Sequence, residues 1–164
     1  MAWRNTSLPA EERAKLLVDA MSFAEKAWIV AGHIPSLTWT GATSGIRRLK
    51  VPIVRYADGP QGFRMNIRKG TTTSWPSVLS YSTTWDEDLV YKWGLLMGKE
   101  FRMKGAGVQL GPGMNVMRIG LNGRDFEYIS GEDPSLGSKL VQPLIKGIQS
   151  NGIMANMKHF VNNN

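Results

Sequence analysis

An apolar run that ends in a glycine–proline turn occupies residues 51–62, VPIVRYADGPQG. Its β-branched residues Val51, Ile53 and Val54 are typical of a buried strand, and the glycine and proline that follow predict a sharp turn. Asp58 stands at the junction, so the strand and the turn would hold its carboxylate in one place. In α/β proteins the loops after the strand ends carry the functional groups, and Asp58 has that position.

Two further polar clusters follow apolar runs later in the chain. Gly123-Arg124-Asp125-Phe126-Glu127 lies in a glycine-rich loop, 111–131, after a predicted strand at 107–110, and Lys158-His159-Phe160 ends a predicted strand at 153–160. Loops beyond the carboxyl ends of parallel strands share one face, so these clusters can meet around one ligand. A loop as long as 111–131 inside a compact domain is also typical of a functional segment.

Helical patterns surround the first predicted strand. Residues 9–31 carry apolar side chains at helical spacing, and Ser22 with Glu25 forms a capping-box pattern. We therefore predict two short helices with a break near Met21.

Further helices separate the later strands. A capping-box pattern at Thr84 and Glu87 predicts a helix over residues 84–104, and Asp133-Pro134 opens another that ends near residue 150. Residues 77–81 form a weaker candidate strand. Alternation of strands and helices predicts an α/β fold with right-handed parallel crossovers.

Composition narrows the class of protein. The chain has 164 residues, 42% of them hydrophobic, with six Trp, which is typical of a globular domain with a packed core. The absence of cysteine excludes disulfides and thiolate metal sites, and no run approaches the ~20 apolar residues that span a bilayer, so no membrane partner is expected. No secretion signal is visible near the start, and both a secreted and a cytoplasmic location stay open.

The charge balance is basic, with 20 Lys and Arg against 13 Asp and Glu. Only residues 67–69 and 99–104 form basic patches, and the other cations are scattered. This distribution favours a solvated surface over a nucleic-acid partner.

Neither a metal nor a nucleotide cofactor is expected. His33 and His159 are far apart and form no metal-binding pattern. The glycines at 105–113 lie before and after a short strand rather than between a strand and a helix, as a dinucleotide loop requires. Gly-x-Ser-x-Gly and Walker patterns are absent.

A sugar would suit the chemistry of the three clusters. A fixed carboxylate at Asp58 can accept hydrogen bonds from two neighbouring hydroxyls, although an Asx turn is the alternative interpretation. Arg124 can donate to a hydroxyl or hold a carboxylate in a bidentate pair. Lys158 ends an apolar strand, where an unpartnered charge is costly, so it is the stronger functional candidate, followed by His159. A twist or bulge at the strand end can turn both side chains towards the site.

In order and spacing, these motifs resemble the amino-terminal domain of glycoside hydrolase family 3, the β-glucosidase and β-xylosidase type. The matching stretches cover nearly the whole chain: 21–26, 53–62, 83–86, 97–101, 108–112, 122–134, 145–149 and 158–160. The resemblance implies an α/β fold, a partial (β/α)8 TIM-barrel-like domain that makes up roughly the first half of a barrel. Residues 1–164 would form this incomplete domain, with 1–50 as a helical lead-in.

By motif match, the resemblance implies that Asp58, Arg124, Lys158 and His159 hold the terminal sugar of a β-glucoside or oligosaccharide in the −1 subsite. It also implies a retaining β-glucosidase-like hydrolase, in which a carboxylate nucleophile and a carboxylic acid stand ~5–5.5 Å apart. No carboxylate of this chain occupies the nucleophile's motif, so we expect both catalytic groups to lie beyond Asn164. We expect a fragment that hydrolyses nothing alone, and whose strand at 153–160 is an apolar edge unless the remainder of the barrel covers it.

Two other functions stay open at this point. A catalytically inactive carbohydrate-binding module would keep the same four sugar contacts, and the reading frame past Asn164 would separate it from the hydrolase fragment. A basic nucleic-acid-binding domain would show salt-dependent retention on DNA that Asp58→Ala and Lys158→Ala leave unchanged. Sugar and linkage specificity depend on later loops.

Overall fold

The computed structural model describes residues 1–32, 39–64 and 70–163, and its four short strands form one sheet in the order β1-β2-β3-β4. The strands are β1 (Gly41–Ala42), β2 (Arg55–Asp58), β3 (Val108–Leu110) and β4 (Met154–Ala155). β2, β3 and β4 pair in parallel, which confirms the predicted parallel arrangement, whereas β1 pairs antiparallel with β2, a pairing that the sequence had not indicated.

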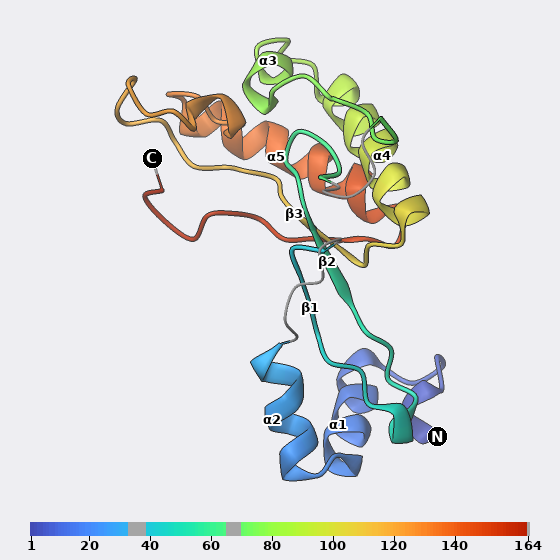
Figure 1. Cartoon of the computed structure of the whole chain (residues 1–164). Helices are drawn as coiled ribbons and strands as arrows, with labels where there is room; N and C mark the ends of the chain where they lie inside the picture. The colour runs from blue at the N-terminus through green and yellow to red at the C-terminus, as the bar shows by residue number, and fades with distance from the viewer. Residues whose placement is uncertain (33–38, 65–69, 164) are drawn as a thin grey trace.

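The sheet lies between two groups of helices (Figure 1). Helices α4 (Glu87–Lys104) and α5 (Pro134–Gln149) pack side by side at one end of the molecule, and α1 (Ala10–Ala20) and α2 (Phe23–Ala31) lie at the other end. The short helical elements are η1 (Ala2–Arg4), η2 (Arg47–Leu49), α3 (Val78–Ser82) and η3 (Asp125–Glu127). No helix in the described part of the chain is both long and apolar enough to cross a bilayer.

The predicted break between the first two helices is confirmed. Met21 is the C-cap of α1, and Ser22 caps α2 by accepting a hydrogen bond from the Glu25 N–H, while the Glu25 carboxylate accepts from the Ser22 N–H. Arg48 reaches the same carboxylate at 2.6 Å and fixes α2 against η2. These hydrogen bonds, that of Arg48 first, lower the pKa of Glu25 to about 2.

Two predictions about α3 and α4 were wrong. Residues 78–81 belong to helix α3 and not to a strand, because Ser77 caps α3 by accepting from the Ser80 N–H. The cap of α4 is Asp86, which accepts from the Leu89 N–H, and not Thr84. Thr84 instead donates its hydroxyl to the Tyr81 carbonyl at 2.7 Å.

Two of the predicted strands are displaced or shortened in the structure. The run at 51–56 becomes β2 only from Arg55 onward, since the Val54 N–H donates to Thr43 Oγ1 and not to a backbone carbonyl of the neighbouring segment. The run at 153–160 is a strand only at Met154–Ala155, and Lys158 then joins the sheet through an isolated bridge to Gly113. The Gly111 N–H donates to Gln109 O within its own segment and Pro112 has no N–H, so β3 and β4 do not continue as one regular ladder through this point.

Helices α4 and α5 approach each other closely enough that glycine is required at the contact. A Cβ atom at Gly147 would lie 2.3 Å from the Tyr91 carbonyl oxygen, and one at Gly94 would lie 2.5 Å from the Leu144 oxygen. The core residues that these two helices bury completely or nearly so include Val90, Met97, Phe101, Leu140, Leu144 and Ile148. The two helices therefore form one rigid layer behind the sheet.

The close contact between α4 and α5 predicts how one added methyl group would change the stability of the fold. Gly147→Ala would force a methyl group into the backbone of α4, so we expect it to destabilise the fold at the upper end of the roughly 1–3 kcal/mol that overpacking costs. Thermal unfolding followed by circular dichroism measures this loss. Gly120→Ala is the matched control, because nothing lies within 4 Å of a Cβ there. Equal melting temperatures for the two variants would contradict the close contact.

Candidate functional site

Asp58 is the last residue of β2 and is held by the turn that follows it. Its N–H donates to Thr40 Oγ1 at 3.0 Å. Gly59 has φ of 141°, and a Cβ there would lie 1.6 Å from the Gly62 carbonyl oxygen, so only glycine fits. The tight turn thus keeps the carboxylate at the carboxyl end of the strand.

Lys158 comes to Asp58 from a position 100 residues later. Its backbone N–H donates to Pro112 O at 3.0 Å, and its carbonyl accepts from the Met114 N–H at 2.8 Å, so both sides of the residue are held by the segment after β3. The Lys158 Nζ atom then lies 3.3 Å from Asp58 Oδ1, with 17% and 29% of the two side chains exposed. The parallel register of β2, β3 and β4 therefore creates a partly buried ion pair.

Arg124 and Glu127 form a second ion pair within the long loop. Arg124 is the N-cap residue of η3, and its Nε donates to Glu127 Oε1 at 2.6 Å while Nη2 contacts the same oxygen. Glu127 is buried, so the guanidinium has a fixed orientation. Arg124 thus holds a carboxylate, one of the two roles that the sequence left open, but both nitrogens contact one oxygen and do not form a bidentate pair.

His159 contacts Arg124 with one ring nitrogen and Tyr128 with the other. Its Nε2 lies 3.2 Å from Arg124 Nη2, and Nδ1 lies 3.1 Å from Tyr128 Oη. Because a guanidinium only donates, Nε2 accepts from Arg124, while Nδ1 also lies 2.9 Å from the Asn163 amide nitrogen. Burial of the ring lowers the pKa of His159 below its usual value, and the charges of Arg124 and Lys158 lower it further.

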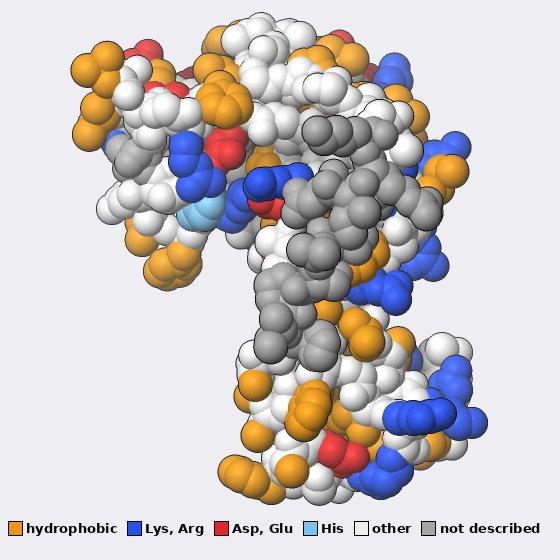
Figure 2. Space-filling model, viewed as in Figure 1, with side chains coloured by type: hydrophobic (Ala, Val, Ile, Leu, Met, Phe, Trp, Pro, Cys, Tyr) orange, Lys and Arg blue, Asp and Glu red, His pale blue; other side chains and the backbone are white. Residues whose placement is uncertain are grey.

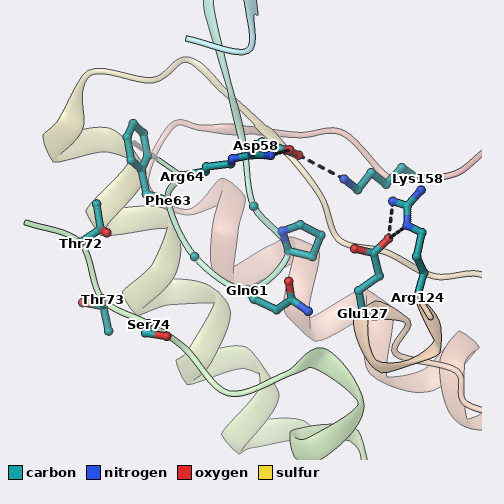
Figure 3. A pocket seen from close by; sticks show the side chains of 13 residues that line it. Asp58, Gln61, Phe63, Arg64, Thr72, Thr73, Ser74, Arg124, Glu127 and Lys158 are labelled. Atoms are coloured by element: carbon teal, nitrogen blue, oxygen red, sulfur yellow. Dashed lines mark hydrogen bonds and ion pairs between the residues drawn. The ribbon is translucent and has the colours of Figure 1, made fainter. Parts of the chain in front are cut away.

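The two ion pairs border a cavity of about 470 Å³. It is lined by Asp58, Gly59, Pro60, Gln61, Gly62, Phe63, Arg64, Thr72, Thr73, Ser74, Arg124, Glu127 and Lys158. Figure 3 shows Arg124, Glu127 and Lys158 on one side and Thr72, Thr73 and Ser74 on the other, and Figure 2 shows opposite charges gathered beside a histidine on this face. The volume lies within the roughly 300–1,000 Å³ of small-molecule pockets.

Three of the four predicted site residues line this cavity: Asp58, Arg124 and Lys158. The fourth, His159, does not line it and instead contacts the guanidinium from the side. His33 and the basic patch at 67–69 lie outside the described residues, and the second patch, at 99–104, lies at the end of α4.

Several lining residues were not singled out from the sequence. Arg64 lies 3.6 Å from Asp58 Oδ2, and the residue follows the predicted turn so closely that its position could have suggested this contact. Thr72, Thr73 and Ser74 gave no such signal, because nothing in a threonine–serine run indicates which part of the fold it covers.

The groups in the cavity suit a neutral, hydroxyl-rich ligand. Asp58 offers about four acceptor sites, of which Lys158 occupies one at normal hydrogen-bond distance, and the ammonium has three donors. Among the described residues, Arg124 uses Nε and Nη2, which leaves Nη1 for a ligand. Acceptors and donors therefore face the same space. Within residues 1–32, 39–64 and 70–163, no three His, Cys, Asp or Glu side chains gather as a metal site.

Comparison with known proteins identifies the class. The profile of the glycosyl hydrolase family 3 N-terminal domain matches residues 39–163, so the chain belongs to this family. It is 38% identical to β-glucosidase BoGH3A of Bacteroides ovatus over 95% of its own length and 21% of that protein's. It is 36% identical to thermostable β-glucosidase B of Acetivibrio thermocellus, with 92% and 20% covered. The chain thus spans about a fifth of the length of the curated relatives it matches.

Solved structures agree with this assignment. β-Glucosidase 3B from Thermotoga neapolitana, in complex with α-D-glucose, matches with a TM-score of 0.85 and 34% identity, over 93% of this chain and 23% of that one. DesR, a β-glucosidase from Streptomyces venezuelae in complex with D-glucose, matches with a TM-score of 0.84 and 37% identity, over 93% and 19%. The predicted α/β fold, part of a TIM-barrel-like domain, is confirmed.

The environment of His159 predicts that the stability of the folded chain depends on pH. We expect its pKa in the folded protein to lie below the unperturbed value of 6.5. Between these two pKa values, the unfolded chain binds more protons than the folded chain. The stabilisation that His159 contributes is therefore complete above about pH 6.5, and it is lost as the pH falls through the pKa of the folded state. Arg124→Met should raise the pKa, but not fully to 6.5, because burial remains.

Proton NMR titration of the His159 Cε1 resonance measures this pKa, and His159→Asn identifies the signal by its loss. A midpoint at or above 6.5 would contradict the arrangement of donors around the ring.

Proposed function

We propose that the cavity binds the terminal glucosyl residue of a β-linked glucoside and forms the −1 subsite of a retaining β-glucosidase-like hydrolase. The observation that carries the proposal is the convergence of Asp58, Lys158 and Arg124 on one cavity. The relatives' names as β-glucosidases, and the glucose in two of the similar structures, support the sugar class.

Each side chain has a distinct role in this proposal. Asp58 accepts hydrogen bonds from two neighbouring hydroxyls, and Lys158 and Arg124 donate to hydroxyl oxygens. His159 completes the set of sugar contacts or, as its bond to Arg124 favours, orients the guanidinium that makes them. Such contacts accelerate hydrolysis when they strengthen at the oxocarbenium-like transition state.

The catalytic carboxyl groups belong, in our proposal, to other segments of a complete enzyme. The two carboxylates that line the cavity already have cationic partners: Asp58 pairs with Lys158, and Glu127 pairs with Arg124. Neither is placed as a free nucleophile. The 164-residue chain would then bind sugar without cleaving it, and a binding-only carbohydrate module remains the alternative function.

We expect Asp58→Asn to abolish most glucose binding. The change keeps the side chain's shape but removes the charge and half of its acceptor capacity. A lost hydrogen bond to a charged group costs about 1.5–3 kcal/mol, so affinity should fall roughly ten- to hundredfold. Titration of the ¹⁵N-labelled chain with glucose, followed by NMR shifts of residues around the cavity, measures the dissociation constant.

Asp88→Asn is the matched control, since Asp88 is exposed in the first turn of α4 and does not line the cavity. Glucose shifts of equal size and midpoint in both variants would refute the sugar site. Salt-dependent retention on DNA that Asp58→Asn leaves unchanged would instead favour a polyanion partner.

A further inference from the structure

One wall of the cavity is a segment without helix or strand. Thr72, Thr73 and Ser74 line the cavity across from the ion pair of Arg124 and Glu127 (Figure 3). Since these residues belong to no sheet ladder or helix, contacts with neighbouring segments must fix their position. The Trp75 N–H, which donates to Gln61 O at 3.2 Å, is one link to the turn after Asp58.

A second link comes from Glu100 on α4. Its Oε1 accepts from the Thr73 backbone N–H at 2.9 Å, and its Oε2 accepts from the Trp75 indole Nε1 at 3.3 Å. Both oxygens of one carboxylate therefore hold two residues of the same segment. The Lys104 ammonium, one turn further along α4, donates to the Thr71 carbonyl and adds a third contact.

Glu100 stands behind the wall rather than inside the cavity. It lines a separate hollow with Trp75, Leu96 and Met103, and it does not line the cavity that holds Asp58. Thr73 lines both, so its backbone separates the two spaces. Glu100 would thus affect a ligand in the cavity only indirectly, through the position of Thr72, Thr73 and Ser74.

Helix α4 is a firm support for this carboxylate. Gly94 and Gly98 pack it against α5, and Met97 and Phe101, which flank Glu100 in sequence, are fully buried. Through its two hydrogen bonds, the Glu100 side chain fixes the irregular segment relative to this rigid helix.

We propose that Glu100 is a positioning residue that holds the Thr72–Ser74 wall at the distance a bound sugar requires. The inference rests on the proposed function of the cavity and adds to it a group that never touches the ligand. The chemistry requires a carboxylate, because two donors face the two oxygens. A glutamine would offer one acceptor oxygen and turn its NH2 group towards the other donor. These two donors would repel each other, and one hydrogen bond to the wall would be lost.

A mutant cycle in the 164-residue chain tests this, with glucose as the probe and NMR shifts of the folded protein as the readout. We expect Glu100→Gln to weaken glucose binding about tenfold, since one donor of the wall loses its partner. The Trp75 indole N–H resonance should move upfield at the same time. In the double variant Glu100→Gln with Trp75→Phe, the repelled donor is gone, so affinity should return to within about threefold of Trp75→Phe alone.

Glu87→Gln is the control, an exposed carboxylate in the first turn of the same helix. The inference is overturned if Glu100→Gln binds glucose within about twofold of the unchanged chain, or if the double variant is weaker than either single one. In both cases a loss in Asp58→Asn still supports the proposed function. If the unchanged chain does not respond to glucose at all, the proposed function fails and the role of Glu100 fails with it.

Discussion

The parallel register of β2, β3 and β4 is the constraint on which the site depends. Asp58 pairs with Leu110 in the ladder, and Met154 pairs with Val108, so the segments after these strands leave the sheet on the same side. Lys158 then reaches Asp58 although 100 residues separate them. A slip of one residue in either pair would turn the side chains to the opposite face and separate the two charges.

The helical layer behind the sheet makes that register rigid. Gly94, Gly98 and Gly147 let α4 and α5 approach at backbone contact, and the buried side chains between them fill the space behind β3. Gln109, fully buried in β3, donates to the Gly59 carbonyl at 3.2 Å and so connects this layer to the turn after Asp58. Packing outside the site therefore determines its geometry. The loops of the site contain little regular secondary structure, but their contacts with this layer fix their position.

Much of the fold and of the candidate site could be predicted from the sequence, because the local turn and capping preferences agree with the overall fold. The strand–turn junction at Asp58, the capping box at Ser22 and the start of α5 at Asp133 follow from turn and capping chemistry, which acts over a few residues. The convergence of Asp58, Lys158 and Arg124 could be expected from the rule that parallel strands direct their loops to one face.

The remainder depended on contacts that no local pattern encodes. The pattern of residues 77–81 resembles a strand, and the N-cap role of Ser77 is not evident from it. Lys158 joins the sheet only through an isolated bridge to Gly113, and this pairing depends on a segment far away in sequence. His159 is held beside Arg124 by Asn115 and Tyr128 of the long loop. Glu100 contributes only because an irregular segment lies across its helix.

The two oxygens of Asp58 meet cations of very different exposure. The Lys158 side chain is 17% exposed, whereas that of Arg64, 3.6 Å from the other oxygen, is 70% exposed. Salt and water weaken the outer contact far more than the inner one. One oxygen therefore keeps a permanent partner while the other exchanges its partner readily with solvent, so a neutral hydroxyl can displace the loosely held cation without breaking the bond that keeps the carboxylate in register.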